Sequence, residues 1–321
     1  MKSEIIDIGK EVIDLQIKSL KKLKNTLNES FSKCVYAIFK CKSKVIICGV
    51  GKSGIIASKI SATLSSVGTP SFTISANDCS HGDLGRITKN DLLILISYSG
   101  NTSELKNIIK YARTNKITLI GIVSNKDSIL YKSSNIKLLI PEVTESGFGI
   151  VPTSSTTIQL SIGDALAIAL MKKKKFGKLD FKKFHPAGSL GNKLKTAGDL
   201  MLIKGKIPFI SENQVIRKAL KIINLKRLGF LVAINKQGQT TGIFTDGDLK
   251  RLMQKKRRIE NLKIKSFMTK NPYVVNENML ATDILYQMNK RKITNVCVYR
   301  NNNKKKTIGV LHIHNLLNNL S

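Results

Sequence analysis

The stretch from Val45 to Lys59 constrains the fold of this 321-residue chain more than any other part of it. It begins with the apolar run Val45–Cys48, which is suited to a strand buried inside a parallel sheet. Gly49, Gly51 and Gly54 follow, and a helix with a periodic apolar face is expected after them. Glycines let the backbone approach a ligand closely, and the free N–H groups at the start of a helix attract negative charge. The stretch therefore predicts an anion-binding turn between a strand and a helix.

The glycine spacing alone does not identify the anion. It matches the G-x-G-x-x-G pattern of dinucleotide-binding folds, but those folds want an acidic residue about 20 positions later, and Asp78 comes late. The G-x-x-x-x-G-K-[ST] spacing of nucleoside triphosphatases also fails. Taken by itself, the stretch leaves open a tight turn with a solvated Lys52.

The net charge of +33 raises the question of nucleic-acid binding. The excess is mostly lysine, however, and it is spread over every segment without a recognition helix or an aromatic RNA-binding signature. We therefore expect no nucleic-acid partner, although a positive surface would attract phosphorylated substrates. No apolar run reaches the roughly 18 residues of a membrane span, so no membrane partner is expected.

The N-terminal sequence and the cysteines indicate the cellular compartment in which the protein is expected. The first 24 residues lack the apolar core of a signal peptide. The five cysteines are odd in number and show no C-x-x-C spacing, which fits a reducing compartment. A cytoplasmic location is therefore expected.

Strands and helices alternate along the first half of the chain. Residues 1–42 are expected to form two helices that pack on the following domain or on a partner subunit. Five strands are expected, at Val45–Cys48, Ser71–Ser75, Leu92–Ser97, Thr118–Ser124 and Ile136–Ile140. The alternation predicts a parallel sheet covered by helices on both faces, with ligands beyond the carboxyl ends of the strands.

Hydroxyl-rich loops follow the third and the fifth expected strands. The first, from Ser97 to Glu104, offers four Ser and Thr hydroxyls, whereas capping of a helix needs only one. We therefore favour phosphate binding by this loop and the amides that follow it. The second comprises residues 153–157 and opens an apolar helix that contains Asp164. An isolated charge in such a helix is costly, so Asp164 is expected to have a partner.

Two of the four histidines, His81 and His185, lie in glycine-containing loops, where a lone histidine is most often a surface residue. Each of them nevertheless falls in one of five motifs that occur in order. The motifs are Gly49–Gly54, Ser80–Gly85, Ser97–Glu104, Pro152–Thr157 and His185–Leu190. Together they resemble a sugar isomerase (SIS) domain, and in particular the arabinose 5-phosphate isomerases.

The second half of the chain contains an internal repeat. The same offset of 67 residues separates Gly242 from Gly309 and Met201 from Met268. Each copy offers a strand, a helix, two strands and a helix, with Leu231–Ile234 and Val296–Tyr299 as equivalent strands. Tandem copies of this kind resemble CBS domains, which pair into a compact module.

An SIS domain followed by two CBS copies is similar to the architecture of full-length arabinose 5-phosphate isomerases. The resemblance implies an α/β fold with an SIS-type parallel sheet flanked by helices, flavodoxin-like and three-layered, followed by an α+β tandem CBS pair. The implied parts are N-terminal helices at 1–42, an SIS domain at 43–195 and CBS domains at 199–257 and 266–321. It also implies a homotetramer, since SIS sites are commonly completed by a neighbouring subunit.

The family that this resemblance points to interconverts D-ribulose 5-phosphate and D-arabinose 5-phosphate, which begins the synthesis of Kdo, the acidic sugar of lipopolysaccharide. By resemblance, the catalytic residues are Lys52, Glu104, Glu145 and His185. Moving a carbonyl between C1 and C2 needs a base that shuttles a proton through a cis-enediol(ate) and a cation that stabilises the oxyanion. We expect Glu145 to be the C–H base, Lys52 the cation, His185 the group for hydroxyl or ring-opening proton transfer, and Glu104 an orienting group. The resemblance implies no cofactor and no required metal.

The same resemblance implies a set of substrate-binding residues. They are Gly51, Ser53, Gly68, Thr69, His81, Ser97, Ser99, Gly100, Asn101, Thr102, Thr153, Ser155 and Thr156. His81 is also a weak candidate ligand for an inhibitory metal ion, but Ser75 stands where many relatives have a second histidine. Asp78-Cys79 and Tyr98 depart from the family pattern as well. The family's Cys-Pro after the catalytic glutamate is absent here, which makes Glu142 a minor rival of Glu145.

Two other functions stay open at this point: a non-catalytic regulator that senses a sugar phosphate, and an isomerase of another phosphosugar. Regulators of this kind usually carry a helix-turn-helix segment, and residues 1–42 are too short for a full DNA-binding domain. CBS pairs often bind nucleotides, so a nucleotide or a Kdo-pathway ligand is expected in the cleft between the copies. Asp248 is the expected ribose contact, and His314-Asn315 lie near the matching place in the second copy.

Overall fold

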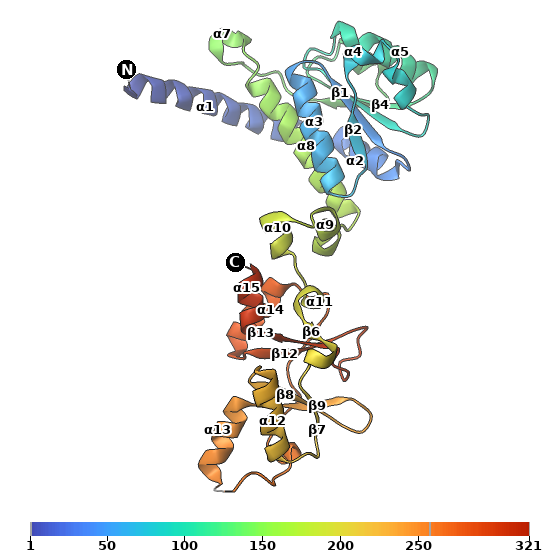
Figure 1. The fold of residues 1–321 in the computed structure, drawn as a ribbon. Helices are drawn as coiled ribbons and strands as arrows, with labels where there is room; N and C mark the ends of the chain where they lie inside the picture. Colours follow the sequence, from blue (N-terminus) through green and yellow to red (C-terminus); the bar gives the residue numbers. More distant parts are fainter. Residues whose placement is uncertain (1, 257, 321) are drawn as a thin grey trace. The chain divides into compact units, whose positions relative to one another are not determined.

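The computed structural model describes residues 2–256 and 258–320, which form two units, Met1–Phe184 and His185–Ser321 (Figure 1). Each unit is described by itself. The first begins with α1 (Lys2–Thr26) and α2 (Glu29–Lys40), as predicted. Asn28 separates them and caps α2, because its side chain accepts a hydrogen bond from the Ser30 amide at 2.8 Å.

The core of the first unit is a five-stranded parallel sheet in the order β2-β1-β3-β4-β5. The strands are β1 (Val45–Gly49), β2 (Ser71–Thr73), β3 (Leu92–Ile96), β4 (Thr118–Val123) and β5 (Ile136–Leu139). All five lie where the sequence predicts them. β2 stops short of the predicted Ser75 because the Ser75 side chain caps the short helix that follows.

Helices cover both faces of this sheet, so the predicted three-layer fold is confirmed. One face packs against α2, α3 (Lys52–Ser66) and α8 (Ser154–Lys173), which together with α1 enclose the larger apolar cluster. The other face packs against α4 (Ala76–Cys79), α5 (Lys106–Thr114) and α6 (Ile129–Ser133). β1 serves both layers, because Val45 and Ile47 belong to the first cluster and Ile46 and Cys48 to the second.

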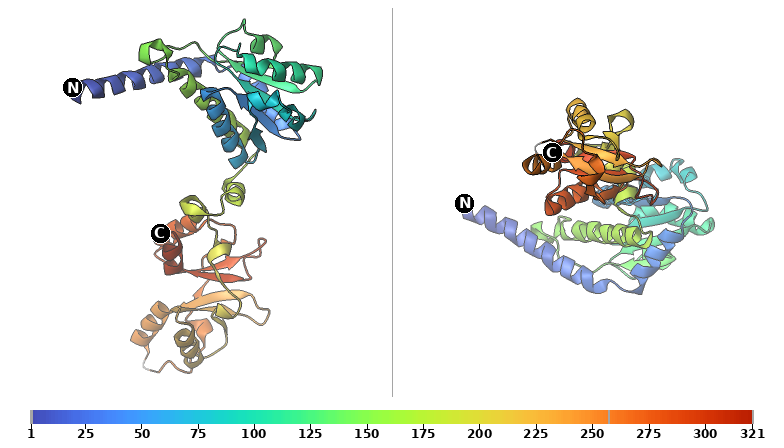
Figure 2. Two further views of the ribbon diagram at one scale, coloured as in Figure 1. Left: turned by 45° about the horizontal axis from the view of Figure 1, so that its top comes forward. Right: turned by 90° about the horizontal axis from the view of Figure 1, so that it is seen from below.

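The helices α3 and α8 lie side by side, as Figures 1 and 2 both show. Asp164 on α8 forms an ion pair with Lys59 on α3, which confirms that Asp164 has a partner. Both side chains are about half exposed, so the pair contributes at most about 1 kcal/mol. The remaining short elements are α7 (Gly147–Ile150), α9 (Lys178–Phe184) and the 3₁₀ turns η1 (Asp83–Arg86) and η2 (Ser103–Leu105).

The second unit contains the predicted repeat. Its first copy comprises β7 (Phe209–Ser211), α12 (Ile216–Lys226), β8 (Phe230–Ile234), β9 (Thr240–Thr245) and α13 (Asp246–Lys255). Its second copy comprises β11 (Val274–Asn276), α14 (Ala281–Arg291), β12 (Asn295–Tyr299), β13 (Gly309–His312) and α15 (Ile313–Leu320). The predicted equivalent strands are β8 and β12.

The two copies are interlocked by exchanged edge strands. β10 (Thr269–Lys270) precedes the second copy but completes the sheet of the first, in the order β10-β9-β8-β7. β6 (Leu202–Ile203) precedes the first copy but completes the sheet of the second, in the order β11-β12-β13-β6. The pair therefore forms one compact module.

A few short elements complete the second unit. They are α10 (Gly188–Lys193), α11 (Ala197–Leu200), η3 (Lys204–Lys206) and η4 (Ile264–Ser266). Across residues 2–256 and 258–320, no helix has both the length and the hydropathy needed to cross a membrane.

Candidate active site

The predicted anion-binding turn lies at the carboxyl end of β1. Gly51 has a φ of +59° and leads directly into α3, so its backbone conformation favours glycine. Gly49 and Gly54 pack together: a Cβ on Gly49 would lie 2.7 Å from the carbonyl oxygen of Ser53. Lys52 is exposed on the first turn of α3, and within the described ranges its ammonium has no ion-pair partner. The turn thus presents helix-start amides beside an available positive charge.

The loop after β3 lies beside this turn, because Gly49 at the end of β1 pairs with Ile96 at the end of β3. The chain leaves β1 toward β2 on one side and returns as β3 on the other, so the ends of β1 and β3 flank the crevice where α/β folds bind ligands. A pocket of about 360 Å³ opens beside it at the ends of β1 and β2 and is lined by Gly51, Ser75 and Asn77 among others. None of the four catalytic candidates lines that pocket.

The hydroxyls of the β3 loop brace the loop itself. The buried Ser97 hydroxyl lies 2.7 Å from the Thr102 hydroxyl and accepts a hydrogen bond from the Gly100 amide at 3.0 Å. Ser99 accepts from the Asn101 amide at 3.3 Å, and the Asn101 side chain accepts from the Ile129 amide at 2.9 Å. The loop is therefore held in one shape before any ligand arrives, and phosphate binding by it stays a prediction.

Glu104 lies on η2, just after this loop. Its carboxylate is exposed and accepts a hydrogen bond from the Ser103 hydroxyl at 2.7 Å. That hydrogen bond lowers the pKa of Glu104 below its usual value. The charged carboxylate is thus available to orient a hydroxyl group of a ligand.

Glu145 is bound to the start of α8. Its carboxylate accepts hydrogen bonds from the Thr153 amide at 2.8 Å, the Ser154 amide at 2.8 Å and the Ser155 amide at 3.2 Å. Partial burial by itself would raise the pKa of Glu145, but the Ser155 hydroxyl and these amides outweigh it and lower the pKa. The carboxylate therefore occupies the positive end of a 20-residue helix, a place suited to an anion.

The connection between Glu145 and α8 is an unusual turn. α7 carries two residues with left-handed backbone, Phe148 at a φ of 61° and Gly149 at 73°. Ser146 and Val151 are bridged across it, and the Phe148 side chain is fully exposed. The turn folds back so tightly that Glu145 meets residues eight to ten positions later.

Tyr98 and Gln159, to which the sequence patterns assign no role, form hydrogen bonds that join distant segments at this end of the unit. The Tyr98 hydroxyl accepts from the Val143 amide at 2.8 Å and donates to the Val143 carbonyl at 3.4 Å, which fixes the segment before Glu145. The Ser53 hydroxyl donates to the buried Gln159 side chain at 3.1 Å, which joins the start of α3 to α8. A glutamine inside an otherwise apolar helix was the signal available for Gln159.

The structure does not bring all predicted residues to this edge. Gly68 and Thr69 precede β2 and therefore lie at the amino ends of the strands, where Lys174 donates to the Gly68 carbonyl at 2.9 Å and to the Thr69 hydroxyl at 2.8 Å. His81 is exposed in the turn after α4. His185 opens the second unit and is half-buried there. The single chain thus assembles Lys52, the β3 loop, Glu104 and the Glu145 segment.

Among the described residues, no group of three His, Cys, Asp or Glu side chains is placed to hold a metal ion. Ser75, which stands where a second histidine would be needed for the inhibitory metal, accepts the Asp78 amide at 3.4 Å through its hydroxyl and caps α4 instead.

The second unit has a cleft of about 440 Å³ between its two copies. The first copy contributes Thr245, Asp246 and Arg251, and the second contributes Asn295 and His312. The side-chain amide oxygen of Asn295, Oδ1, is buried without a hydrogen-bond partner in the described part of the chain. Burial, and then the neighbouring His314, lower the pKa of His312.

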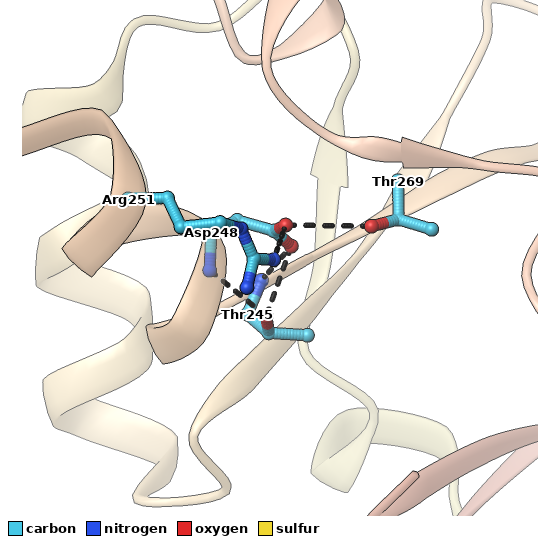
Figure 3. A network of polar contacts seen from close by, with 4 residues as sticks. All are labelled: Thr245, Asp248, Arg251 and Thr269. Atoms are coloured by element: carbon cyan, nitrogen blue, oxygen red, sulfur yellow. Dashed lines mark hydrogen bonds and ion pairs between the residues drawn. The ribbon is translucent and has the colours of Figure 1, made fainter. Parts of the chain in front are cut away.

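Asp248, the predicted ribose contact, does not line this cleft. Figure 3 shows that its carboxylate is taken up inside the first copy. It accepts from the Thr245 amide and hydroxyl, both at 2.9 Å, and from Arg251 at 2.5 Å and Thr269 at 3.4 Å. The first of these bonds belongs to a capping box at the start of α13, whose other bond runs from the Asp248 amide to the Thr245 hydroxyl at 3.2 Å. In this structure Asp248 is therefore the buried carboxylate of a capping box whose N-cap residue is Thr245.

Comparison with known proteins matches both units. Residues 37–169 match the SIS domain family, and residues 197–255 and 264–321 each match the CBS domain family. An uncharacterized protein of Rickettsia prowazekii is 37% identical over 310 residues, which cover 97% of this chain and 96% of that protein. The arabinose 5-phosphate isomerase KdsD of Yersinia pestis is 40% identical over 311 residues, which cover 96% of this chain and 94% of KdsD. A solved structure of E. coli CFT073 c3406 in complex with arabinose 5-phosphate is 35% identical with a TM-score of 0.56, and covers 58% of this chain and 100% of its own.

Proposed function

This chain belongs to the family of arabinose 5-phosphate isomerases that carry an SIS domain followed by two CBS domains, and from that premise we propose that it interconverts D-ribulose 5-phosphate and D-arabinose 5-phosphate. The observation that carries the proposal is the likeness to KdsD over nearly the whole of both chains. The structure of c3406 with arabinose 5-phosphate supports the same substrate, because its entire chain matches this one.

The sugar phosphate would bind in the crevice between the ends of β1 and β3. The α3 amides and the exposed Lys52 favour an anion there, and the braced β3 loop adds hydroxyls and further amides. Lys52 would stabilise the negative charge that develops on the oxygen of the cis-enediol(ate). Glu104 would orient the hydroxyl groups.

Glu145 would move the proton between C1 and C2. While it is bound to the α8 amides its pKa is low, so it is a weak base. Substrate binding that draws the carboxylate away from those amides would raise its pKa and strengthen it as a base. Glu142, its rival, is exposed, and among the described residues its carboxylate accepts no hydrogen bond. His185 would transfer the hydroxyl proton or open the sugar ring.

A matched pair of variants tests the proposal. The purified full chain is given D-arabinose 5-phosphate, and ketose formation is followed for wild type, Glu145→Gln and Glu142→Gln. We expect Glu145→Gln to lose at least about 100-fold in turnover, since a positioned acid–base group contributes at least that much, while Glu142→Gln stays near wild type. Saturable binding of the sugar phosphate without turnover in any variant would favour the regulator, and faster turnover of a hexulose phosphate would favour the other isomerase.

The wider setting is also proposed from the family. The product would enter Kdo and lipopolysaccharide synthesis in the cytoplasm, and the chain would assemble as a homotetramer. A nucleotide or a Kdo-pathway ligand would occupy the cleft between the CBS copies, where Arg251 offers a cation and Asn295 an unsatisfied acceptor. A change in turnover on adding such ligands to the full chain, absent after truncation near Leu200, would support that role.

A further inference from the structure

The turn α7 exposes apolar side chains next to the candidate active site. Within four residues, Phe148 is 102% exposed, Ile150 75% and Val151 48%. Figure 1 shows this turn standing out from the body of the unit beyond the start of α8. Single exposed apolar residues are common on protein surfaces, but several of them together beside a site indicate a surface that contacts something.

The backbone of Phe148 has a conformation that its side chain disfavours. Its φ of 61° lies in the left-handed region, where a bulky residue is a true outlier. Among the residues that the structure describes, the other non-glycine residues with a positive φ are lysines, an arginine and asparagines. Such conformations cluster at ligand clamps and at segments that move. Phe148 would therefore gain stability by leaving this conformation.

Two buried hydroxyl groups near the ends of the turn are unsatisfied as well. The hydroxyls of Ser146 and Ser154 have no hydrogen-bond partner in the described part of the chain, although both residues are buried. Unpaired buried polar groups are rare in native proteins, and each of them costs stability. Together with the strained Phe148, they indicate a resting shape that ligand binding can exchange for another.

The glycines on either side of Phe148 let the turn change shape. Gly147 and Gly149 have φ values of 59° and 73°, and glycine adopts positive and negative φ about equally readily. The turn is anchored just outside them, because the Val151 amide donates a hydrogen bond to the Ser146 carbonyl at 3.2 Å. A change at the two glycines thus moves Phe148 while the anchor stays in place.

Phe148 lies near enough to the proposed reaction to cover it. It is three residues from Glu145, and three residues of chain span at most about 11 Å. When Glu145 acts on C1 and C2 of the sugar, the tip of the turn is therefore within reach of the same sugar. The charge of a cis-enediol(ate) is stabilised more strongly where water is excluded, and an apolar ring is suited to exclude it.

We propose that α7 is a lid of the candidate active site and that Phe148 is the residue with which it covers the bound sugar. Binding of the sugar phosphate draws the Glu145 carboxylate away from the α8 amides, and the turn rearranges at Gly147 and Gly149. Phe148 then moves from solvent onto the sugar, so that closure and release of the base are one movement. The inference rests on the proposed function, because it takes the sugar phosphate as the ligand that closes the lid.

Fluorescence of a single tryptophan tests the lid, because the chain contains no tryptophan. Phe148→Trp in the full chain places the probe at the tip of the turn, and Ile168→Trp, at an exposed residue further along α8, is the matched control. Without ligand, iodide should quench both probes. Saturating D-arabinose 5-phosphate should shift the Phe148→Trp emission to shorter wavelength and protect it from iodide, while the Ile168→Trp signal stays unchanged. Inorganic phosphate, which offers no sugar to cover, should change neither.

Truncation of the same side chain gives the functional readout. Phe148→Ser removes a fully exposed ring, so the melting temperature should not fall, whereas kcat with D-arabinose 5-phosphate should. Ile168→Ser should leave kcat unchanged. A loss of kcat without a loss of stability is not expected of a residue that is merely structural.

Four results would overturn the lid. They are an unchanged Phe148→Trp signal while calorimetry shows the sugar phosphate binding, an equal shift with inorganic phosphate alone, an unchanged kcat in Phe148→Ser, and a probe already shielded in the ligand-free chain. The last result would show that the turn packs on another surface, such as a neighbouring subunit. A shift on binding without turnover would support the lid and contradict the isomerase, and turnover without a shift would contradict the lid alone.

Discussion

The change Glu145→Gln tests the structural role that the geometry gives to this carboxylate. In wild type it accepts hydrogen bonds from three backbone amides at the start of α8. Glutamine keeps one acceptor oxygen but loses the negative charge, so both the charge-assisted hydrogen bonds and the favourable interaction with the helix end are weakened. Loss of a cap costs about 0.5–2 kcal/mol, and the charge at a helix start is worth about 0.3–1 kcal/mol.

These contributions overlap, so we expect the free energy of unfolding of the first unit to fall by about 1–2 kcal/mol. For a unit of this size each kcal/mol corresponds to about 2–4 °C, so the melting temperature should fall by about 2–8 °C at pH 7. The assay is thermal unfolding followed by circular dichroism. Glu142→Gln, at an exposed carboxylate three residues earlier, is the matched control and should melt like wild type.

The pH dependence gives the sharper test. The pKa of Glu145 is lower in the folded chain than its unfolded value of about 4.3. The stability that the ionised Glu145 carboxylate gives to the folded unit is therefore fully present above that unfolded pKa. It is lost as the pH falls through the lowered pKa of the folded state. The difference between wild type and Glu145→Gln should shrink from pH 7 toward pH 3. An equal melting temperature at pH 7, or a difference independent of pH, would refute the assignment of Glu145 to the α8 amides.

Three other substitutions have defined outcomes. Gly54→Ala should lower the melting temperature of the first unit, because its Cβ would lie 2.8 Å from a backbone carbonyl oxygen, whereas Gly85→Ala, which meets no atom within 4 Å, should not. Tyr98→Phe leaves the Val143 amide without its hydrogen-bond partner. We expect the free energy of unfolding to fall by about 1–3 kcal/mol and kcat in the isomerase assay to fall as well. An unchanged kcat would contradict a role of Tyr98 in positioning the segment before Glu145. Asp248→Ala removes the buried carboxylate of the α13 capping box and leaves the Thr245 amide without its partner. This should cost the second unit about 1–3 kcal/mol in its unfolding transition, and an unaltered transition would show that the carboxylate is dispensable.

Much of the fold could be predicted because its signals are local. The apolar run at Val45–Cys48 and the glycines after it specify a buried strand and a close turn, and both lie where predicted. The ion pair of Asp164 followed from the cost of an isolated charge, although the sequence did not indicate that Lys59 would supply it. The constant offset of the repeat predicted two equivalent copies but not the exchange of edge strands, which depends on where each copy's first strand docks.

The contacts around the candidate site were harder to predict because they join distant positions. Tyr98 meets Val143, and Ser53 meets Gln159 from over 100 residues away. The hydrogen bonds between the Glu145 carboxylate and the α8 amides depend on the turn at α7, where Phe148 has a left-handed backbone. A phenylalanine rarely adopts that conformation. The sequence position of Asp248 predicted a ribose contact. In the structure its carboxylate instead accepts hydrogen bonds from its neighbours Thr245 and Arg251.

The most direct test of the proposed function is isomerisation of D-arabinose 5-phosphate by the purified full chain in D₂O, followed by NMR. A proton shuttle through a cis-enediol(ate) predicts that deuterium enters the carbon-bound position next to the carbonyl during turnover, and that Glu145→Gln loses both turnover and label. Turnover that leaves the carbon-bound hydrogen unexchanged and survives Glu145→Gln would contradict the account.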